Sequence, residues 1–198
     1  MKQHKKNLPM DLDKYIKVYD NALDVNLCRN ILHSTKNVEM KRWDRGGRPQ
    51  FNEFNITDHA ENKDHPDDIW NTIHNQVIQA VKDVSNRYME EVGCQQQWPY
   101  SNALEQVRLK HYQVDQNDRF DEHADVGDHA SARRFLAMFF YLNDVEKGGE
   151  TKFEHRSIKP VQGRCLAFPP MWMFPHAGAA PITAVSYTHL RAHETNSN

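Results

Sequence analysis

Residues 134–153 read RFLAMFFYLNDVEKGGETKF, and they decide which class of fold the chain can adopt. The apolar run at 135–142 has the length of a buried strand, and residues 151–153 form a second strand candidate. Between them, Lys147-Gly148-Gly149 is typical of a tight turn. The run is far shorter than the roughly 20 residues that cross a bilayer. The stretch therefore predicts buried strands and no membrane span.

A long amphipathic helix is predicted upstream, at residues 67–92. Its apolar residues recur every three or four positions and so share one face: Ile69, Ile73, Val77, Val81, Val84, Tyr88 and Val92. Such a face must cover an apolar surface, and the chain after residue 103 supplies one as a series of short strand candidates. The remaining candidates are residues 104–114, 158–168, 172–174 and 182–188.

The region before this helix has less regular structure. Residues 15–19 alternate as in a half-buried strand, and Asp24 precedes apolar residues at helical spacing. Residues 37–62 are charged and irregular, which predicts a surface loop with one edge strand at 51–56. The expected fold is thus α+β and mainly β, a sandwich or jelly roll with helices packed on one sheet.

Composition limits the possible function classes. A chain of 198 residues is expected to form a single domain. Its 25 Lys and Arg against 27 Asp and Glu give a net charge of -2, which disfavours binding to nucleic acid or anionic lipid. Its three cysteines, Cys28, Cys94 and Cys165, are far apart and form no disulfide or zinc pattern. With no apolar leader near Met1, we expect a cytoplasmic protein.

Candidate metal ligands lie in FDEHADVGD, residues 120–128. His123 and Asp125 are two residues apart, so on an extended chain their side chains point to the same face. A third ligand must come from elsewhere, and His176, in MFPHAG, is a candidate from a later strand. Two imidazoles and one carboxylate form the facial triad of non-haem Fe(II) oxygenases, which leaves the opposite side of the ion open.

Two other His-x-acid sequences are better explained by structural roles. His65-Pro66-Asp67 lies where the long helix begins, and a proline and acidic residues suit a first helical turn. His59-Ala60-Glu61 lies in the charged loop. Because a chain with 12 histidines contains such sequences by chance, His123 and Asp125 need support from their surroundings.

That support comes from the segments around and after the motif. RFDEHAD, FFYLNDVEKGGET, KPVQGRCLAFPP and PHAG together resemble the catalytic half of the 2-oxoglutarate- and Fe(II)-dependent dioxygenases, specifically the prolyl 4-hydroxylase-like family. The resemblance covers about residues 104–183. It implies a double-stranded β-helix in which His123, Asp125 and His176 ligate iron near one end of the barrel.

The resemblance also implies further site residues and the cofactors. Thr151 and Tyr112 match positions that contact 2-oxoglutarate in relatives, and Arg134 matches a position that can contact a peptide substrate. A strand-favouring residue, a core residue and a solvated surface charge are the respective structural alternatives. Fe(II), 2-oxoglutarate and O2 are implied, and an ascorbate requirement would rest on the resemblance alone.

The chain departs from the family pattern at Ser186. Relatives carry a Lys or Arg about ten residues after the last iron ligand, where it pairs with the far carboxylate of 2-oxoglutarate. Ser186 brings no positive charge, and neither Arg191 nor Arg164 occupies the family position. The sequence thus leaves open whether any cation reaches the cosubstrate.

The end of the chain differs as well. The resemblance fades at Ala184, and YTHLRAHETNSN resembles a translated adapter sequence, so we expect the native C-terminus to have been replaced. The predicted organisation is a polar arm at 1–14, one dioxygenase domain at 15–188 and an atypical polar tail at 189–198. Helical support would span 24–92, and the β-helix core 103–188. His189 and His193, in the tail, are not expected to bind metal.

The favoured function is a dioxygenase that hydroxylates a prolyl or related residue of a peptide or protein, with release of succinate and CO2. Two alternatives stay open. One is a noncatalytic jelly-roll binding protein in which Ser186 impairs 2-oxoglutarate binding. The other is an oxygenase of the same fold that acts on a nucleobase or small metabolite, and the near-neutral charge counts against nucleic acid. The sequence does not determine the oligomeric state.

Overall fold

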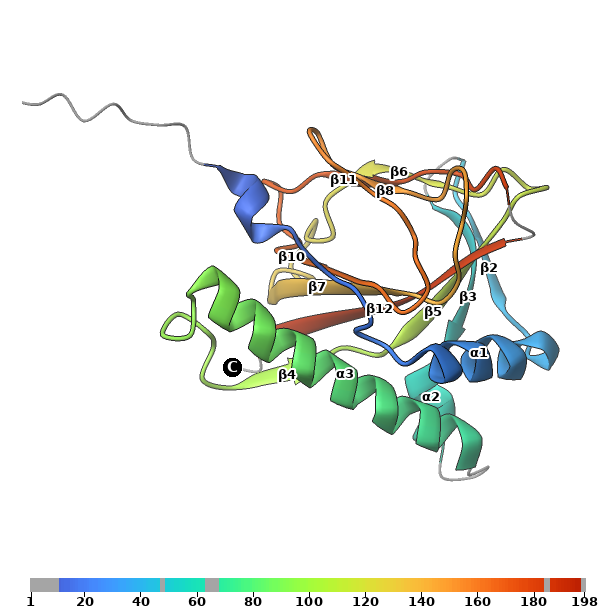
Figure 1. The fold of residues 1–198 in the computed structure, drawn as a ribbon, viewed down its shortest axis with the longest axis horizontal. Helices are drawn as coiled ribbons and strands as arrows, with labels where there is room; N and C mark the ends of the chain where they lie inside the picture. Colours follow the sequence, from blue (N-terminus) through green and yellow to red (C-terminus); the bar gives the residue numbers. More distant parts are fainter. Residues whose placement is uncertain (1–10, 47–48, 63–67, 184–185, 197–198) are drawn as a thin grey trace, which may run out of the picture.

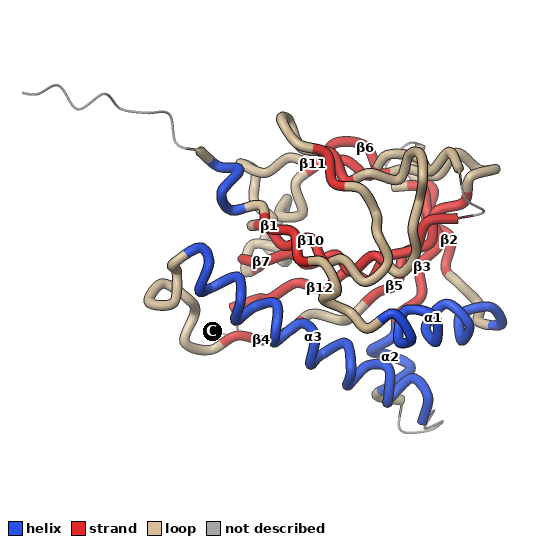
Figure 2. The backbone as a smooth tube through the Cα atoms, viewed as in Figure 1, coloured by secondary structure: helices blue, strands red, loops and turns tan. Residues whose placement is uncertain are grey.

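A computed structural model describes residues 11–46, 49–62, 68–183 and 186–196. In this part of the chain two β-sheets face each other, and helices cover the outer face of the larger sheet (Figure 1). Figure 2 shows that strands form the layers around the interior, while the three labelled helices, α1, α2 and α3, lie together on one side. The predicted fold class, mainly β with helical support on one sheet, is confirmed.

The larger sheet has eight strands, and the smaller has four. The larger has the order β1 (Lys17–Tyr19), β10 (Cys165–Phe168), β7 (Arg134–Tyr141), β12 (Ser186–Asn196), β5 (Arg108–Gln113), β3 (Gln50–Asn55) and β2 (Lys41–Asp44), with β4 (Asn102–Leu104) paired to β12. The smaller has the order β6 (Phe120–His123), β11 (His176–Gly178), β8 (Thr151–Lys152) and β9 (Ser157–Ile158). These pairings are antiparallel, as in a jelly roll.

The helices of the described residues are α1 (Val25–Ser34), α2 (Ile56–Ala60) and α3 (Asp68–Val92), preceded by a 3-10 turn at Leu12–Tyr15. Asp24 caps α1, because its Oδ1 accepts hydrogen bonds from the backbone N of Asn26 and Leu27 at 2.8 and 3.1 Å. The helix predicted at 67–92 is confirmed as α3. Its apolar face is buried against the larger sheet, except that Ile69 is half-exposed and Trp70 packs on Phe54 instead.

Several segments differ from the sequence-based expectation, among them residues 158–168, which contribute to two strands, β9 and β10, instead of one. Residues 41–55, expected to be a loop with one edge strand, form the β2–β3 hairpin, and β3 lies inside the sheet because it pairs with β5. Residues 172–174 form a turn instead of a strand, in which the backbone N of Phe174 donates to the carbonyl of Met171 at 2.9 Å. The expected strand at 182–188 includes residues outside the described ones, as does His65-Pro66-Asp67.

β12 contains most of the residues that were expected to form a polar tail. It lies between β7 and β5 near the centre of the larger sheet and pairs with both. Leu190 and Ala192 are buried in the core cluster that includes α3, while Arg191 and His193 face the other way. This alternation allows the segment to complete the sheet despite its polar composition. The strand thus extends beyond the expected core boundary at residue 188.

Two apolar clusters fill the molecule. One lies between the helices and the larger sheet and includes Phe140 and Leu109. The other lies between the sheets and includes Phe139, Phe168 and Tyr112. Adjacent residues of β7 therefore serve opposite layers, and the inner layer is the one that can carry a site. Within the described residues, no helix combines the length and apolarity needed to span a bilayer.

An ion pair between a buried carboxylate and a partly exposed guanidinium holds the segment between β5 and β6. The fully buried Asp118 accepts hydrogen bonds from Nη1 and Nη2 of Arg42 at 2.8 and 2.6 Å and from the backbone N of Gln113 at 3.0 Å. Asp118→Ala leaves the amide and the guanidinium without these acceptors. We therefore expect the free energy of unfolding, measured by urea denaturation, to fall by about 2–3 kcal/mol.

A surface pair provides the control for this prediction. Asp20 accepts a hydrogen bond from Nε of Arg164 at 2.7 Å, but its side chain is 61% exposed. Asp20→Ala is expected to cost less than about 1 kcal/mol, because water replaces an exposed ion pair at little cost. Equal losses for the two variants would contradict the importance given to burial of Asp118.

Candidate metal centre

β6 and β11 bring the two candidate histidine ligands together. His123, at the end of β6, and His176, at the start of β11, are partners in the antiparallel register, and their ring centroids are 4.5 Å apart. Asp125 follows β6 by two residues and is buried. One possible ligand atom from each of the three lies within 4.8 Å of the others. The structure therefore assembles the three residues that the sequence predicts as metal ligands.

Backbone hydrogen bonds set the orientation of both imidazole rings. Nδ1 of His123 donates to the carbonyl of Asp121 at 2.8 Å, and Nδ1 of His176 donates to the carbonyl of Phe174 at 3.2 Å. With the proton on Nδ1, each Nε2 presents a lone pair. Metal-binding histidines commonly have this arrangement, in which the second nitrogen is held by a carbonyl group.

The second nitrogen of His176 shows that the site fits a cation. Nε2 is buried, has no hydrogen-bond partner among the described residues, and lies 3.8 Å from Oδ2 of Asp125. Burial lowers the pKa of His176 to about 4, so the ring is neutral at pH 7. A buried nitrogen lone pair without a partner is unusual in a folded protein. Two imidazoles and a carboxylate are a donor set that suits Fe(II).

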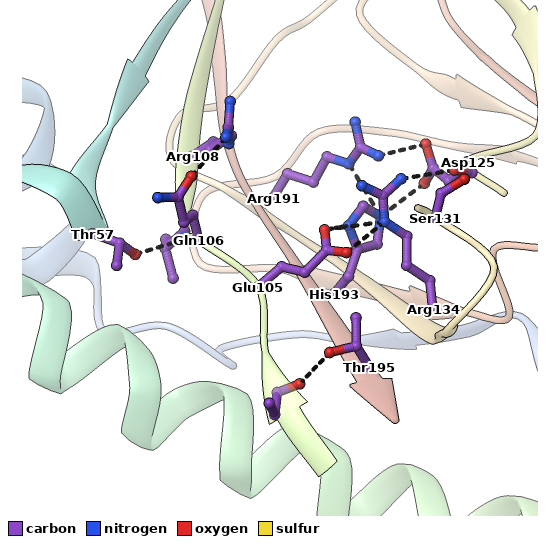
Figure 3. A network of polar contacts seen from close by, with 12 residues as sticks. Thr57, Glu105, Gln106, Arg108, Asp125, Ser131, Arg134, Arg191, His193 and Thr195 are labelled. Carbon is purple, nitrogen blue, oxygen red and sulfur yellow. Dashed lines mark hydrogen bonds and ion pairs between the residues drawn. The ribbon is translucent and has the colours of Figure 1, made fainter. Parts of the chain in front are cut away.

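Asp125 is also contacted from β12, as Figure 3 shows. Nη2 of Arg191 donates to Oδ1 at 2.8 Å, and Nε2 of His193 is hydrogen-bonded to Oδ2 at 3.1 Å. Burial opposes ionisation of Asp125, but the charge of Arg191 and the contact with His193 hold the pKa well below its usual range. Sequence reasoning missed both residues. The available signal was the period-two spacing of His189, Arg191 and His193.

The residues matched to 2-oxoglutarate contacts line the same cavity as the three candidate ligands. Tyr112 and Thr151 are both buried there. Thr151 is hydrogen-bonded through Oγ1 to the hydroxyl of Tyr141 at 2.9 Å, and Tyr112 packs on Phe51 with ring centroids 5.4 Å apart. The structure brings both residues to the site, and their contact with a cosubstrate stays a prediction. Sequence reasoning missed Lys110, which lines this cavity as well.

Arg134 lies in a neighbouring groove of about 940 Å³ that also reaches His123 and Asp125. Its Nε donates to Oε1 of Glu105 at 2.8 Å, and its Nη1 donates to the carbonyl of Asp125 at 2.8 Å. Arg134 is therefore held by ion pairing and is not a freely solvated charge (Figure 3). The groove is lined by residues of both charges, among them Glu53 and Arg108.

The loss of protein stability at low pH tests the contacts that Glu105 makes with Arg134 and His193. Burial opposes its ionisation, but hydrogen bonds and charge from His193 and Arg134 outweigh burial and lower the pKa of Glu105 to about 2. A carboxyl whose pKa is lower in the folded state stabilises the fold above its ordinary pKa and loses this contribution as pH falls. Between pH 5 and pH 2.5 we therefore expect Glu105→Gln to lose about 2 kcal/mol less of its unfolding free energy than the unaltered protein.

Urea denaturation across this pH range measures the difference. Glu122→Gln, at an exposed position on β6, is the matched control and should follow the unaltered protein. Identical acid limbs for Glu105→Gln and Glu122→Gln would show that the contacts of Glu105 do not stabilise the folded state.

Comparison with known proteins places these residues in a family. Residues 107–189 match the model described as the 2OG-Fe(II) oxygenase superfamily, and this segment contains the three candidate ligands, Tyr112 and Thr151. Residues 107–189 belong to this superfamily. For this segment, the match confirms the family of Fe(II)- and 2-oxoglutarate-dependent oxygenases that the sequence predicts. No curated protein matches the chain.

Solved structures of 2OG-Fe(II) oxygenases share the fold. A viral collagen prolyl hydroxylase from Paramecium Bursaria Chlorella virus-1, in complex with 2OG, has 17% sequence identity and a TM-score of 0.65 over 91% of this chain and 95% of that one. A Pseudomonas putida prolyl-4-hydroxylase has 13% sequence identity and a TM-score of 0.68, over 93% of this chain and 94% of that one. A third structure is that of a Trichoplax adhaerens prolyl hydroxylase in complex with a hypoxia inducible factor peptide fragment. It has 12% sequence identity and a TM-score of 0.67, over 92% of this chain and 84% of that one.

Proposed function

We propose that this protein is an Fe(II)- and 2-oxoglutarate-dependent dioxygenase that hydroxylates a prolyl or related residue of a peptide or protein. The observation that carries the proposal is the buried Nε2 of His176, which faces His123 and Asp125 without a hydrogen-bond partner among the described residues. It lies within the segment that matches the superfamily. The expected products are the hydroxylated residue, succinate and CO2.

The residues around the site have separate tasks in this proposal. His123, Asp125 and His176 would hold Fe(II), and the bound ion would supply the redox chemistry between O2, 2-oxoglutarate and a C–H bond. The backbone carbonyls that accept from the two Nδ1 atoms fix the imidazole rings. Apolar side chains of the inner cluster, such as Phe139 and Phe168, keep water away from the site.

The groove beside the metal centre supports a peptide substrate. It is open, has a volume of about 940 Å³ and borders His123 and Asp125. Its lining carries both acidic and basic side chains, which suits the backbone and polar side chains of an extended peptide better than a polyanionic strand. Three of the neighbours of similar fold are prolyl hydroxylases, and one of these is complexed with a peptide.

Succinate formation from 2-oxoglutarate tests the proposal. The full chain is loaded with Fe(II) in the absence of oxygen, mixed with a library of proline-containing peptides, and exposed to O2 with and without ascorbate. We expect succinate to form in proportion to a peptide product that is 16 Da heavier. Oxygen-dependent succinate formation that no peptide increases would argue against a peptide substrate, and Asp125→Ala provides the background.

A second candidate function is a noncatalytic binding protein, and one observation favours it. Both carboxylate oxygens of Asp125 are occupied by Arg191 and His193, which compete with a metal for this ligand. Ser186, in place of the family cation, points the same way. Comparison of the unaltered chain with Ser186→Lys separates the candidates. If neither the unaltered chain nor Ser186→Lys forms succinate, the noncatalytic binding protein is favoured. Succinate formation by the unaltered chain excludes it.

A further inference from the structure

Lys110 is a buried cation in the cavity of the candidate metal centre. It lies on β5 with only 3% of its surface exposed, and it lines the cavity together with His123, Asp125 and His176. Its ammonium lies 4.4 Å from the ring centroid of Phe51 and 5.2 Å from that of Phe120. Aromatic faces attract a cation but do not replace an anionic partner.

Among the described residues, the contacts found for the Lys110 ammonium are with these two aromatic rings, and none is an ion pair with a carboxylate. Lysine is almost never fully buried unless it is paired, because removal of the charge from water is costly. Burial and the positive charge of Arg191 lower the pKa of Lys110 well below its usual value, although the nearby charges of Asp125 and Glu53 oppose the shift. The fold thus keeps a destabilising amine in this cavity, which points to an anionic ligand as its missing partner.

Arg191 is less suited to this role, although it lines the same cavity. Its Nη2 is bonded to Asp125 at 2.8 Å, and its Nε lies 3.2 Å from Nε2 of His193.

We propose that Lys110 supplies, from β5, the positive charge that binds the distal carboxylate of the 2-oxo acid cosubstrate. This inference rests on the proposed function, and it makes Lys110 the residue that selects a dicarboxylic over a monocarboxylic 2-oxo acid. Tyr112, two residues along β5, and Thr151 line the same cavity and can donate hydroxyl hydrogen bonds.

Entry of the acid requires side chains to move. In this arrangement the cavity has a volume of about 20 Å³, which holds roughly one water molecule. Arg191 closes part of it through the contact with Asp125.

Calorimetric titration of the Mn(II)-loaded full chain tests the role of Lys110 without catalysis. The ligands are 2-oxoglutarate and 2-oxopentanoate, which has the same chain length but no distal carboxylate. We expect Lys110→Met to weaken 2-oxoglutarate binding by about 10- to 100-fold, the range of a charged hydrogen bond, and to leave 2-oxopentanoate binding within about twofold. Lys152→Met, at an exposed position on β8, should change neither affinity.

Each further outcome has a defined meaning. Unchanged 2-oxoglutarate affinity in Mn(II)-loaded Lys110→Met would overturn the role of Lys110 and leave the proposed function intact. Failure of the unaltered chain to bind Mn(II) would overturn both. Because Lys110→Met removes a buried charge, we expect its melting temperature to be equal or higher. Lys110→Gln provides a polar, neutral second variant that should show the same selective loss.

Discussion

Replacement of His176 by alanine is expected to weaken Mn(II) and Fe(II) binding by at least about 100-fold, since even residues that only support a metal ligand change affinity by 10- to 100-fold. His176 supplies a buried imidazole nitrogen that has no hydrogen-bond partner among the described residues and lies 3.8 Å from Oδ2 of Asp125. Without it, one imidazole and one carboxylate remain. Anaerobic titration calorimetry measures the affinity, and oxygen-dependent succinate formation should fall to background.

The control is a histidine outside the site. His155 is exposed and pairs only with the exposed Glu154, so His155→Ala should bind Mn(II) as the unaltered chain does. The circular dichroism spectra of both variants should match that of the unaltered chain. Retention of full metal affinity by a folded His176→Ala variant would exclude His176 as a ligand.

Phe140→Ala is expected to lower the free energy of unfolding by about 4 kcal/mol, which is typical of a fully buried phenylalanine. Phe140 is completely buried on β7, which pairs with both β10 and β12, and its side chain lies in the cluster between the larger sheet and the helices. Truncation leaves a cavity at the centre of this layer. Urea denaturation measures the loss.

Because Phe140 lies on the face of β7 that packs on the helices, we expect Phe140→Ala to retain its metal affinity. Its neighbour Phe139 packs 5.8 Å from the His176 ring, in the inner cluster, whereas Phe140 points away from the site. Metal affinity of Phe140→Ala, measured well below its melting temperature, should therefore stay within about twofold. Tyr100→Ala, at a fully exposed position, should lose less than about 0.5 kcal/mol. A loss below 1 kcal/mol for Phe140→Ala would contradict the assigned core.

The features predicted correctly from sequence are those with local signals. α3 is visible because its apolar residues repeat at helical spacing, and α1 because Asp24 is a good capping residue. The structure brings His123 and Asp125 to one cavity, as their spacing indicates, and their role as metal ligands stays a prediction. His176 was reached through the resemblance, and the β6–β11 register explains why it faces His123.

The features that sequence reasoning missed depend on pairing between distant segments. The β2–β3 hairpin joins the larger sheet because β3 pairs with β5, more than 50 residues later in the sequence, and nothing in its charged sequence indicates this partner. β12 has the composition of a solvated tail, yet its alternating small and apolar residues fit between β7 and β5. Lys110 has the pattern of a surface lysine, and its burial follows only from the closure of the two sheets.

The contacts of Asp125 with β12 connect the candidate metal centre to the end of the chain. Arg191 and His193 neutralise the carboxylate from a strand whose sequence departs from the family pattern. A metal at this site must compete with them, whereas the two imidazoles are already oriented by the backbone. Variation in the last strand can thus tune metal affinity without any change in the three ligands.

Anomalous diffraction from crystals of the full chain grown with Mn(II) tests the central claim most directly. We predict one strong anomalous peak bounded by Nε2 of His123, Nε2 of His176 and a carboxylate oxygen of Asp125, with Arg191 displaced from that carboxylate. A Mn(II) peak at other residues, or none while Asp125 keeps its contacts with Arg191 and His193, would contradict the assignment of this site as a metal centre.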